Sequence, residues 1–305
     1  MIRSITTTLM AMTFAFPTLA DTTSETGKSH FLQMCEDEET SVEARRTIDN
    51  IMRHYGKDCE RADEILSSLK ELRLTDEQIT DVSPLAGLTS LRRLDLWNKK
   101  ITDVSPLAGL TSLEWLDLSN NQITDVSPLA GLTSLERLWL SSNQITDISP
   151  LAGLTSLERL SAPDNQITDI DALAGLTSLT ELFIGFNQIT DVSPLAELTS
   201  LETLFLGVNQ ITDVSPLAGL TRLDHVALQH NHITDVSPLA GLTSITSLDL
   251  YNNQITDVSP LAGLTSLFKY YLYLDRNQIT ENEIHCPTGT ENSALNYFCK
   301  RYLAE

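Results

Sequence analysis

Aromatic residues at one recurring set of positions have the side chains best suited to bind a partner. Each lies one, two, four or six residues before a polar residue, usually asparagine, that recurs about every 22 residues. They are Trp97, Trp115, Trp139, Phe183, Phe186, Phe205, Tyr251 and, if two extra residues before the last strand leave its register intact, Tyr271 and Tyr273. Exposed aromatic side chains often provide much of the energy of a protein interface. We therefore expect these positions to form a binding surface.

The repeat that carries these residues predicts a solenoid. It reads ITDVSPLAGLTSLEWLDLSNNQ from Ile101, and related copies run from about Leu66 to Thr280. A fixed period of about 20 to 50 residues is the signature of stacked repeats. Residues equivalent to Leu116 and Leu118 should enter the core from a short parallel strand, so the alternate side chains face outward. We predict ten such units, with the outward side chains aligned on the concave face of one sheet.

Two polar columns should hold each repeat in shape. Asparagine amides can pair with backbone groups that the bend after each strand leaves free. Glu77 and Lys99 interrupt this column, so we expect looser turns there. In the other half of each repeat, segments such as the one from Ser105 predict a short 3-10 turn on the convex face, which aspartates such as Asp103 should cap rather than bind cations. The asparagine column occupies Glu77, Lys99, Asn121, Asn143, Asn165, Asn187, Asn209, Asn231, Asn253 and Asn277.

The centre of the expected binding surface lies in two adjacent repeats. Phe183 and Phe205 should be neighbours, with Phe186 and Val208 beside them, and His225 lies on the same face. Two glycines should leave a depression there, at Gly185 and Gly207. The charged rim should consist of Arg93, Asp95, Asp117, Arg137, Arg159 and Glu181. The alternative interpretation is random variation at solvent positions, or aromatic residues that pack only on one another.

Metal binding and catalysis have weaker support in the sequence. His225, His230 and His232 form the one cluster that suggests a metal, but no carboxylate stands at ligand spacing, so a polar surface is the favoured interpretation. We predict no metal site and no cofactor. The sequence contains no G-x-S-x-G, H-E-x-x-H or phosphate-loop motif. We therefore predict that the protein is not an enzyme.

The charge and the N-terminus indicate an exported protein. The net charge of −21 argues against nucleic acid and against an anionic lipid surface as partners. Residues 1–20 resemble a signal peptide, with Arg3 before an apolar stretch and a small-residue site ending at Ala20. A disordered or buried N-terminus is the alternative. We expect a monomer in the periplasm or secreted, without membrane insertion.

Helical and disulfide-bonded caps should close both ends of the repeats. We expect disorder over 21–28, a helical cap over 29–65, the repeat domain over 66–280 and a C-terminal cap over 281–305. Thr40-x-x-Glu43 resembles a helix capping box, and Val42 should lie on the buried face of that helix. The repeats hold the two cysteine pairs far apart, so only the pairings Cys35–Cys59 and Cys286–Cys299 are geometrically reasonable. A zinc site is the less favoured alternative, because the spacing matches no common cluster.

The repeat motif also resembles a known family. The unit L-x-x-L-x-L-x-x-N-x-I-T-D-V-S-P-L-A-G-L is similar to the leucine-rich repeat of internalins, which are secreted bacterial proteins. The resemblance covers about Leu66 to Thr280 and implies an α/β leucine-rich-repeat solenoid, curved and right-handed. It also implies recognition of a protein by the concave face. Internalins usually carry a further immunoglobulin-like domain, which we do not expect here, so the resemblance does not imply host-cell invasion.

These observations lead to one function and two alternatives. We expect an exported, non-enzymatic scaffold that binds a partner through its aromatic concave face. Whether that partner is a protein or a glycan stays open, since exposed Trp and Tyr serve either. The alternatives are a passive spacer of the cell envelope and, if the N-terminus is not a signal peptide, an intracellular protein resembling the phosphatase-regulating subunits that use a similar repeat.

Overall fold

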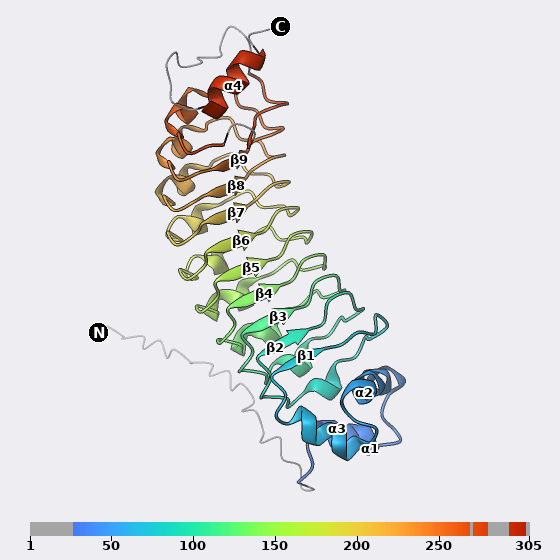
Figure 1. Cartoon of the computed structure of the whole chain (residues 1–305). Coiled ribbons are helices and arrows are strands. Elements are labelled where there is room, and N and C mark those ends of the chain that lie inside the picture. The colour runs from blue at the N-terminus through green and yellow to red at the C-terminus, as the bar shows by residue number, and fades with distance from the viewer. Residues whose placement is uncertain (1–26, 269–270, 280–292, 303–305) are drawn as a thin grey trace, which may run out of the picture.

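The computed structural model describes residues 27–268, 271–279 and 293–302, which form one elongated stack of repeats with helices at both ends (Figure 1). Ten short strands form a single parallel sheet in which every strand pairs with the next one along the chain. The predicted solenoid is therefore confirmed. The expected signal peptide over 1–20 and most of the expected disordered segment lie outside the described residues.

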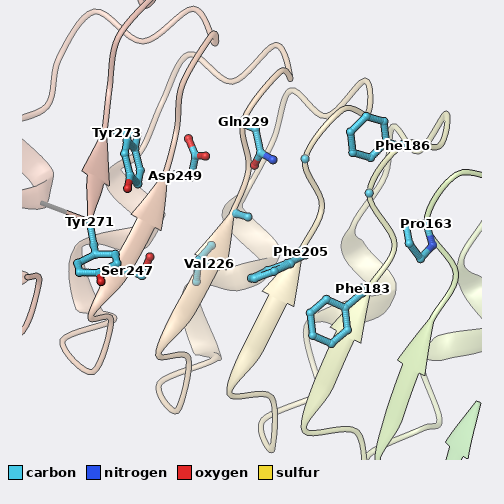
Figure 2. Close-up of a pocket in the computed structure, with 13 residues that line it drawn as sticks. Pro163, Phe183, Phe186, Phe205, Val226, Gln229, Ser247, Asp249, Tyr271 and Tyr273 are labelled. Carbon is cyan, nitrogen blue, oxygen red and sulfur yellow. The ribbon is translucent and has the colours of Figure 1, made fainter. Parts of the chain in front are cut away.

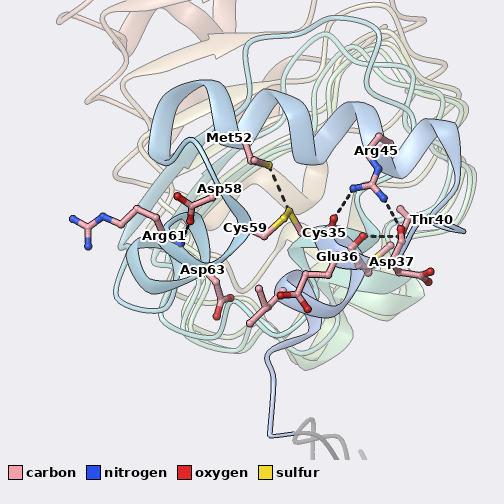
Figure 3. The surroundings of a disulfide bond; sticks show 12 residues. Cys35, Glu36, Asp37, Thr40, Arg45, Met52, Asp58, Cys59, Arg61 and Asp63 are labelled. Atoms are coloured by element: carbon pink, nitrogen blue, oxygen red, sulfur yellow. Dashed lines mark hydrogen bonds between the residues drawn. A yellow bond between two sulfur atoms is a disulfide. The ribbon is translucent and has the colours of Figure 1, made fainter.

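Three helices form the N-terminal cap: α1 (His30–Glu36), α2 (Val42–Tyr55) and α3 (Cys59–Leu66). The expected disulfide between Cys35 and Cys59 ties α1 to α3, and the S–S distance is 2.06 Å (Figure 3). Asp58 begins α3 by accepting a hydrogen bond from Arg61 N. Phe31, Ile48, Ile51 and Leu66 are fully buried and extend the core of the repeats into this cap.

Two details of the predicted cap are wrong. Ser41, not Thr40, caps α2, because its Oγ accepts the Ala44 N–H at 3.0 Å. Thr40 instead donates its hydroxyl to the carbonyl of Met34. This shift of one residue turns the first helical residue outward, so Val42 is 73% exposed rather than buried. The first helix, α1, was also missed, because its seven residues are too few to show a helical period.

The strands are short and regularly spaced. Each of the three-residue strands carries its central residue into the core and, apart from Ser161, turns its flanking side chains outward, as the alternation of a strand requires. Partners in adjacent strands lie one repeat apart, as in Leu94 beside Leu116. The strands are β1 (Glu71–Arg73), β2 (Arg93–Asp95), β3 (Trp115–Asp117), β4 (Arg137–Trp139), β5 (Arg159–Ser161), β6 (Glu181–Phe183), β7 (Thr203–Phe205), β8 (His225–Ala227), β9 (Ser247–Asp249) and β10 (Leu272–Tyr273).

Short 3-10 helices form the opposite side of the stack. Aspartate carboxylates hold them, as expected: Asp103 Oδ1 accepts the Ser105 N–H at 2.8 Å, and the same contact recurs in later repeats. This contact explains why aspartate stands two residues before each turn. The turns span Ser83–Leu85, Ser105–Leu107, Ser127–Gly131, Ser149–Gly153, Asp171–Leu173, Ser193–Leu195, Ser215–Gly219, Ser237–Gly241 and Ser259–Gly263.

The asparagine column joins neighbouring repeats as predicted. Asn187 is buried, and its Nδ2 donates to the carbonyls of Ala162, Ile184 and Gly185 at 3.0 to 3.2 Å. Its Oδ1 accepts the Ile167 N–H at 2.9 Å. One side chain thus pairs with backbone groups of its own bend and of the preceding repeat.

Lys99 replaces only part of this network. Its Nζ donates to the carbonyl of Trp97 at 2.9 Å, as the asparagine amides do within their own bends. It offers no acceptor to the preceding repeat, where the Ile79 N–H reaches the Asp76 carbonyl only at 3.5 Å. Burial lowers the pKa of Lys99, and the carboxylate of Asp95 opposes that shift. The β1–β2 pairing nevertheless keeps its register.

The C-terminal end of the repeat stack, like the N-terminal end, is covered by a helix. The two extra residues before β10 leave its register intact, because Leu272 pairs with Leu248 and Tyr273 with Asp249. Helix α4 (Ser293–Tyr302) then covers β10 with the buried side chains of Leu295, Phe298 and Cys299. Cys299 lies in a disulfide. Its expected partner Cys286 lies outside the described residues, so that pairing stays a prediction.

Candidate binding surface on the sheet

The outward side chains of the ten strands and of the bends that follow them form one continuous surface, which we call the sheet face. The residues expected on it fall into three groups along the stack. A tryptophan cluster lies on β3 and β4, an apolar pocket is centred on β6 and β7, and a histidine–tyrosine pair lies on the bends that follow β8 and β9.

The tryptophan cluster consists of Trp115, Trp139 and Arg93. The two indole rings lie 4.7 Å apart, and the Arg93 guanidinium lies 3.8 Å from the centre of the Trp115 ring. Asp117 lies beside Trp139 in the sheet, and its partial burial raises the pKa of that carboxyl. The cluster is therefore a half-buried patch of aromatic and charged groups in contact.

Arg159 connects the tryptophan cluster to the phenylalanines. Its guanidinium lies 5.7 Å from the Trp139 ring and 4.9 Å from the Phe183 ring. One of its terminal nitrogens pairs with Glu181 at 2.9 Å. We expected both residues on a charged rim, but this pair lies in the middle of the sheet face, between two aromatic groups.

Phe183 and Phe205 form one side of a pocket of about 390 Å3 (Figure 2). They are partners in adjacent strands, and their rings meet edge to face at 4.8 Å between centres. A volume of this size is within the range of pockets that hold small ligands or single side chains. The full lining of this phenylalanine pocket is Pro163, Phe183, Gly185, Phe186, Phe205, Gly207, Val226, Ala227, Gln229, Ser247, Asp249, Tyr271 and Tyr273.

Two glycines line the pocket, and at Gly185 the backbone itself excludes a larger residue. A Cβ atom on Gly185 would lie 2.7 Å from the carbonyl oxygen of Gly207. A Cβ atom on Gly207 would lie 2.4 Å from the side chain of Gln229, which occupies that space. Both glycines of the predicted depression line the pocket, and the Gln229 side chain fills the space over Gly207.

The residue directly before each asparagine adopts a left-handed backbone conformation. Most of these positions hold residues that tolerate positive φ, such as Asn120 and Asn252. Phe186 and Val208 have φ angles of 53° and 59°. A β-branched residue in this conformation is strained. This strain lies beside the phenylalanine pocket, because both residues belong to the repeats that form its floor.

Asp249 is the carboxylate of the pocket. Its Oδ1 accepts the Tyr251 N–H at 2.9 Å. Desolvation by burial raises the pKa of this carboxyl, while the Tyr251 hydrogen bond and the nearby His230 oppose the shift. Asp249 therefore carries its charge in a partly dry site.

The structure brings only some of the predicted binding residues together. Phe183, Phe186 and Phe205 line one pocket, and Tyr271 and Tyr273 line it from the other end. Trp97, Val208, His225 and Tyr251 lie on the sheet face but do not line this pocket. Their role in binding stays a prediction, as does that of the tryptophan cluster.

The remaining charged residues surround the tryptophans rather than the phenylalanines. Arg93 and Arg137 line a separate, mostly charged pocket of about 300 Å3 with Trp115. Asp95 pairs with Arg73 at 3.2 Å and lies beside Asp117 in the sheet. These residues therefore edge the N-terminal half of the sheet face.

The three histidines do not converge on one point. His225 Nδ1 lies 3.1 Å from Asp224, and the corresponding atoms of His230 and His232 contact Asn252 and Gln254. Among the described residues, no group of three His, Cys, Asp or Glu side chains is placed to hold a metal ion.

Six lining residues were missed from the sequence: Pro163, Val226, Ala227, Gln229, Ser247 and Asp249. Val226 is a buried strand residue, and the other five stand two, four or six residues before a column asparagine, at the outward positions that the repeat predicts. Their positions in the repeat could therefore have identified these residues, but the prediction was based mainly on aromatic residue types.

Comparison with known proteins agrees with this architecture. The family model for leucine-rich repeats, which spans two copies of the repeat, matches this chain five times. The matches cover residues 67–109, 111–153, 155–197, 199–241 and 221–263, which together exceed half of the chain. The chain belongs to the leucine-rich-repeat family. No curated protein matches it by sequence.

Solved structures show which members of the family this repeat protein is similar to. Internalin C2 of Listeria monocytogenes is 40% identical, with a TM-score of 0.63, over 66% of this chain and 91% of its own. Internalin F of the same organism is 31% identical, with a TM-score of 0.53, over 88% and 95%. The ectodomain of the Arabidopsis thaliana receptor kinase GASSHO1/SCHENGEN3 is 22% identical, with a TM-score of 0.59, over 68% and 27%, and shares the fold alone. The repeat protein is therefore internalin-like.

Proposed function

We propose that this internalin-like protein is a non-enzymatic scaffold that binds another protein through its sheet face, with the phenylalanine pocket at the centre. The pocket itself carries the proposal. Phe186, Phe205, Tyr271 and Tyr273 are each between 39% and 58% exposed around it. Exposed aromatic side chains gathered around one hollow are typical of interface anchors.

The rest of the surface supports a large partner rather than a small molecule. The aromatic and charged groups extend without a break from Arg93 on β2, through Arg159, to Tyr273 on β10. The Arabidopsis receptor of the same fold is in complex with CASPARIAN STRIP INTEGRITY FACTOR 2, so this kind of scaffold holds a partner in at least one case.

We also propose that the protein acts outside the cytoplasm. The Cys35–Cys59 disulfide supports this location, because such bonds persist in oxidising compartments. None of the helices in the described part of the chain is long and apolar enough to cross a membrane. The segment 1–20 would direct export, and mass spectrometry of the native protein would detect its removal.

The test is a binding measurement on a partner isolated by affinity capture from envelope or host extracts. The double variant Phe183→Ala and Phe205→Ala should weaken binding by about thirtyfold or more, the size expected for an interface hot spot of about 2 kcal/mol. Val42→Ala, which removes an exposed apolar side chain from α2, is the control and should leave affinity unchanged. Equal affinity of the double variant for every captured partner would favour a passive spacer instead.

A further inference from the structure

The phenylalanine pocket has a polar side that its aromatic rings do not explain. Gln229 and Asp249 both line it, and Figure 2 shows Asp249 between Gln229 and Tyr273. Gln229 Oε1 is buried and has no hydrogen-bond partner within the described part of the chain. Asp249 uses Oδ1 for the Tyr251 N–H, and its Oδ2 accepts no hydrogen bond from any described residue. Gln229 Oε1 is thus a buried acceptor without a partner, which is unfavourable, and Asp249 Oδ2 is an accessible acceptor, so this side of the pocket lacks a donor.

The missing donor should be positively charged. One of the two acceptors is a carboxylate in a partly dry site, where an opposite charge interacts more strongly than in water. Aromatic rings at both ends of the pocket attract a cation to their faces. The chain as a whole carries a net charge of −21, which favours a basic partner at longer range.

Arginine fits this site better than lysine. The guanidinium group is planar, stacks on aromatic rings and presents several N–H donors in a fixed fork, so one group can reach two acceptors. The sheet face already contains this arrangement once, because the Arg159 guanidinium lies 4.9 Å from the Phe183 ring and pairs with Glu181 at 2.9 Å. Arg276 similarly lies 5.5 Å from the Tyr251 ring.

We propose that the phenylalanine pocket receives an arginine side chain from a partner polypeptide. The guanidinium donates to Asp249 Oδ2 and, once the Gln229 amide turns from Gly207 towards the pocket, to Gln229 Oε1. The aliphatic stem packs against Phe205 and Tyr273. This inference rests on the proposed function and adds the chemical class of the segment that the sheet face recognises.

The experiment uses the full chain and a display library of short random peptides. Selected peptides should contain arginine. In the best of them, exchange of that arginine for citrulline, which has the same shape without the charge, should weaken binding by about tenfold to a hundredfold, as expected for a lost hydrogen bond to a charged group. Lysine at the same place should give an intermediate affinity.

Variants of the pocket should reproduce the loss. Asp249→Asn keeps the acceptor for the Tyr251 N–H but removes the charge, and it should weaken the arginine peptide by about the same factor as citrulline does. Gln229→Met keeps the length of the side chain, removes the free acceptor and should also weaken binding. Asp257→Asn is the matched control, because it removes one negative charge from the same repeat on the opposite side and should not change affinity.

Three results would overturn the assignment. The first is a set of selected peptides without basic residues that still depend on Phe183 and Phe205; this result would leave the proposed function intact. The second is an arginine peptide that binds Asp249→Asn as tightly as the unchanged chain. The third is a set of peptides that binds equally well without Phe183 and Phe205, or a library that yields no binder. Peptides that bind equally well without Phe183 and Phe205 would also count against the proposed function.

Discussion

Asp191 and Asp249 are both aspartates of the repeats, but they lie in opposite environments. Asp191 holds a 3-10 turn, and the N–H and hydroxyl of Ser193 lower its pKa. Asp249 lies on the sheet face, where burial raises its pKa. The first carboxylate stabilises the fold in its charged form, whereas the charge of the second is unfavourable for the fold.

The same contrast extends to the other polar groups of the two sides. Every column asparagine from Asn121 to Asn277 has its amide paired with the backbone. Three buried side-chain atoms lack hydrogen-bond partners in the described residues: Gln229 Oε1 and Arg159 Nε lie on the sheet face, and Thr80 Oγ1 does not. Val208, which is strained, also lies on the sheet face. Departures from local stability rules are expected to gather at functional sites. The contrast therefore supports binding by the sheet face independently of its aromatic residues.

Loss of a column asparagine should produce the largest change. Asn187→Ala would leave the buried Ile167 N–H without a partner, and it would remove one of the two hydrogen bonds that the carbonyl of Ala162 accepts. Since an unpaired buried group costs about 1–3 kcal/mol, we expect the free energy of unfolding to fall by about 2–3 kcal/mol. Chemical denaturation followed by circular dichroism measures this change. If the free energy of unfolding fell by less than it does for a typical surface substitution, the asparagine column would not be what holds the repeats together.

The reverse substitution at the interrupted position is the matched control. Lys99→Asn would supply the Oδ1 acceptor that the Ile79 N–H now lacks, and it would remove a buried ammonium group whose pKa is lowered by burial. A lowered lysine pKa means that the charged form is disfavoured in the folded state, so at neutral pH its removal should stabilise the chain. The two substitutions should therefore shift the denaturation midpoint in opposite directions.

The sequence predicts the scaffold better than the binding surface, and the reason is physical. One period specifies the strands, the asparagine column and the aspartate-held turns, because each copy must satisfy the same backbone groups. The pocket instead depends on which outward residues of six repeats meet. Phe183 and Phe205 were found because their repeats are adjacent, but Gln229 and Asp249 resemble ordinary polar residues of the surface. The left-handed conformation at Val208 was also missed, because valine does not signal it.

Relief of the strain at Val208 should produce a smaller change of opposite sign. A left-handed conformation costs an ordinary residue about 1–2 kcal/mol, and asparagine tolerates it better. We expect Val208→Asn to raise the free energy of unfolding by about 1 kcal/mol, since the backbone N–H still donates to the Gln229 carbonyl. Asn252→Val, at the same position two repeats later, should lower it by a similar amount. If the Asn variant also binds the captured partner more weakly, the strained valine serves the interface.

The smallest effect should come from the charge of Asp249. Its folded-state pKa lies above the ordinary value of 3.8, so the folded state binds the proton more tightly and stability falls as the pH rises through that window. Asp249→Asn removes this penalty, and at neutral pH we expect the Tm to rise by about 1–2 °C. The gain should vanish in acid, where Asp249 itself is protonated, and thermal unfolding at both pH values measures it.

Asp191→Asn should show the opposite sign, because its lowered pKa makes the carboxylate stabilising above the ordinary pKa. If the Asp249→Asn variant is more stable but fails to bind arginine peptides, this carboxylate contributes to recognition at the expense of stability. If Asp249→Asn instead destabilised the chain at neutral pH, the two aspartates would belong to one structural class, and the contrast between the two sides of the repeat would disappear.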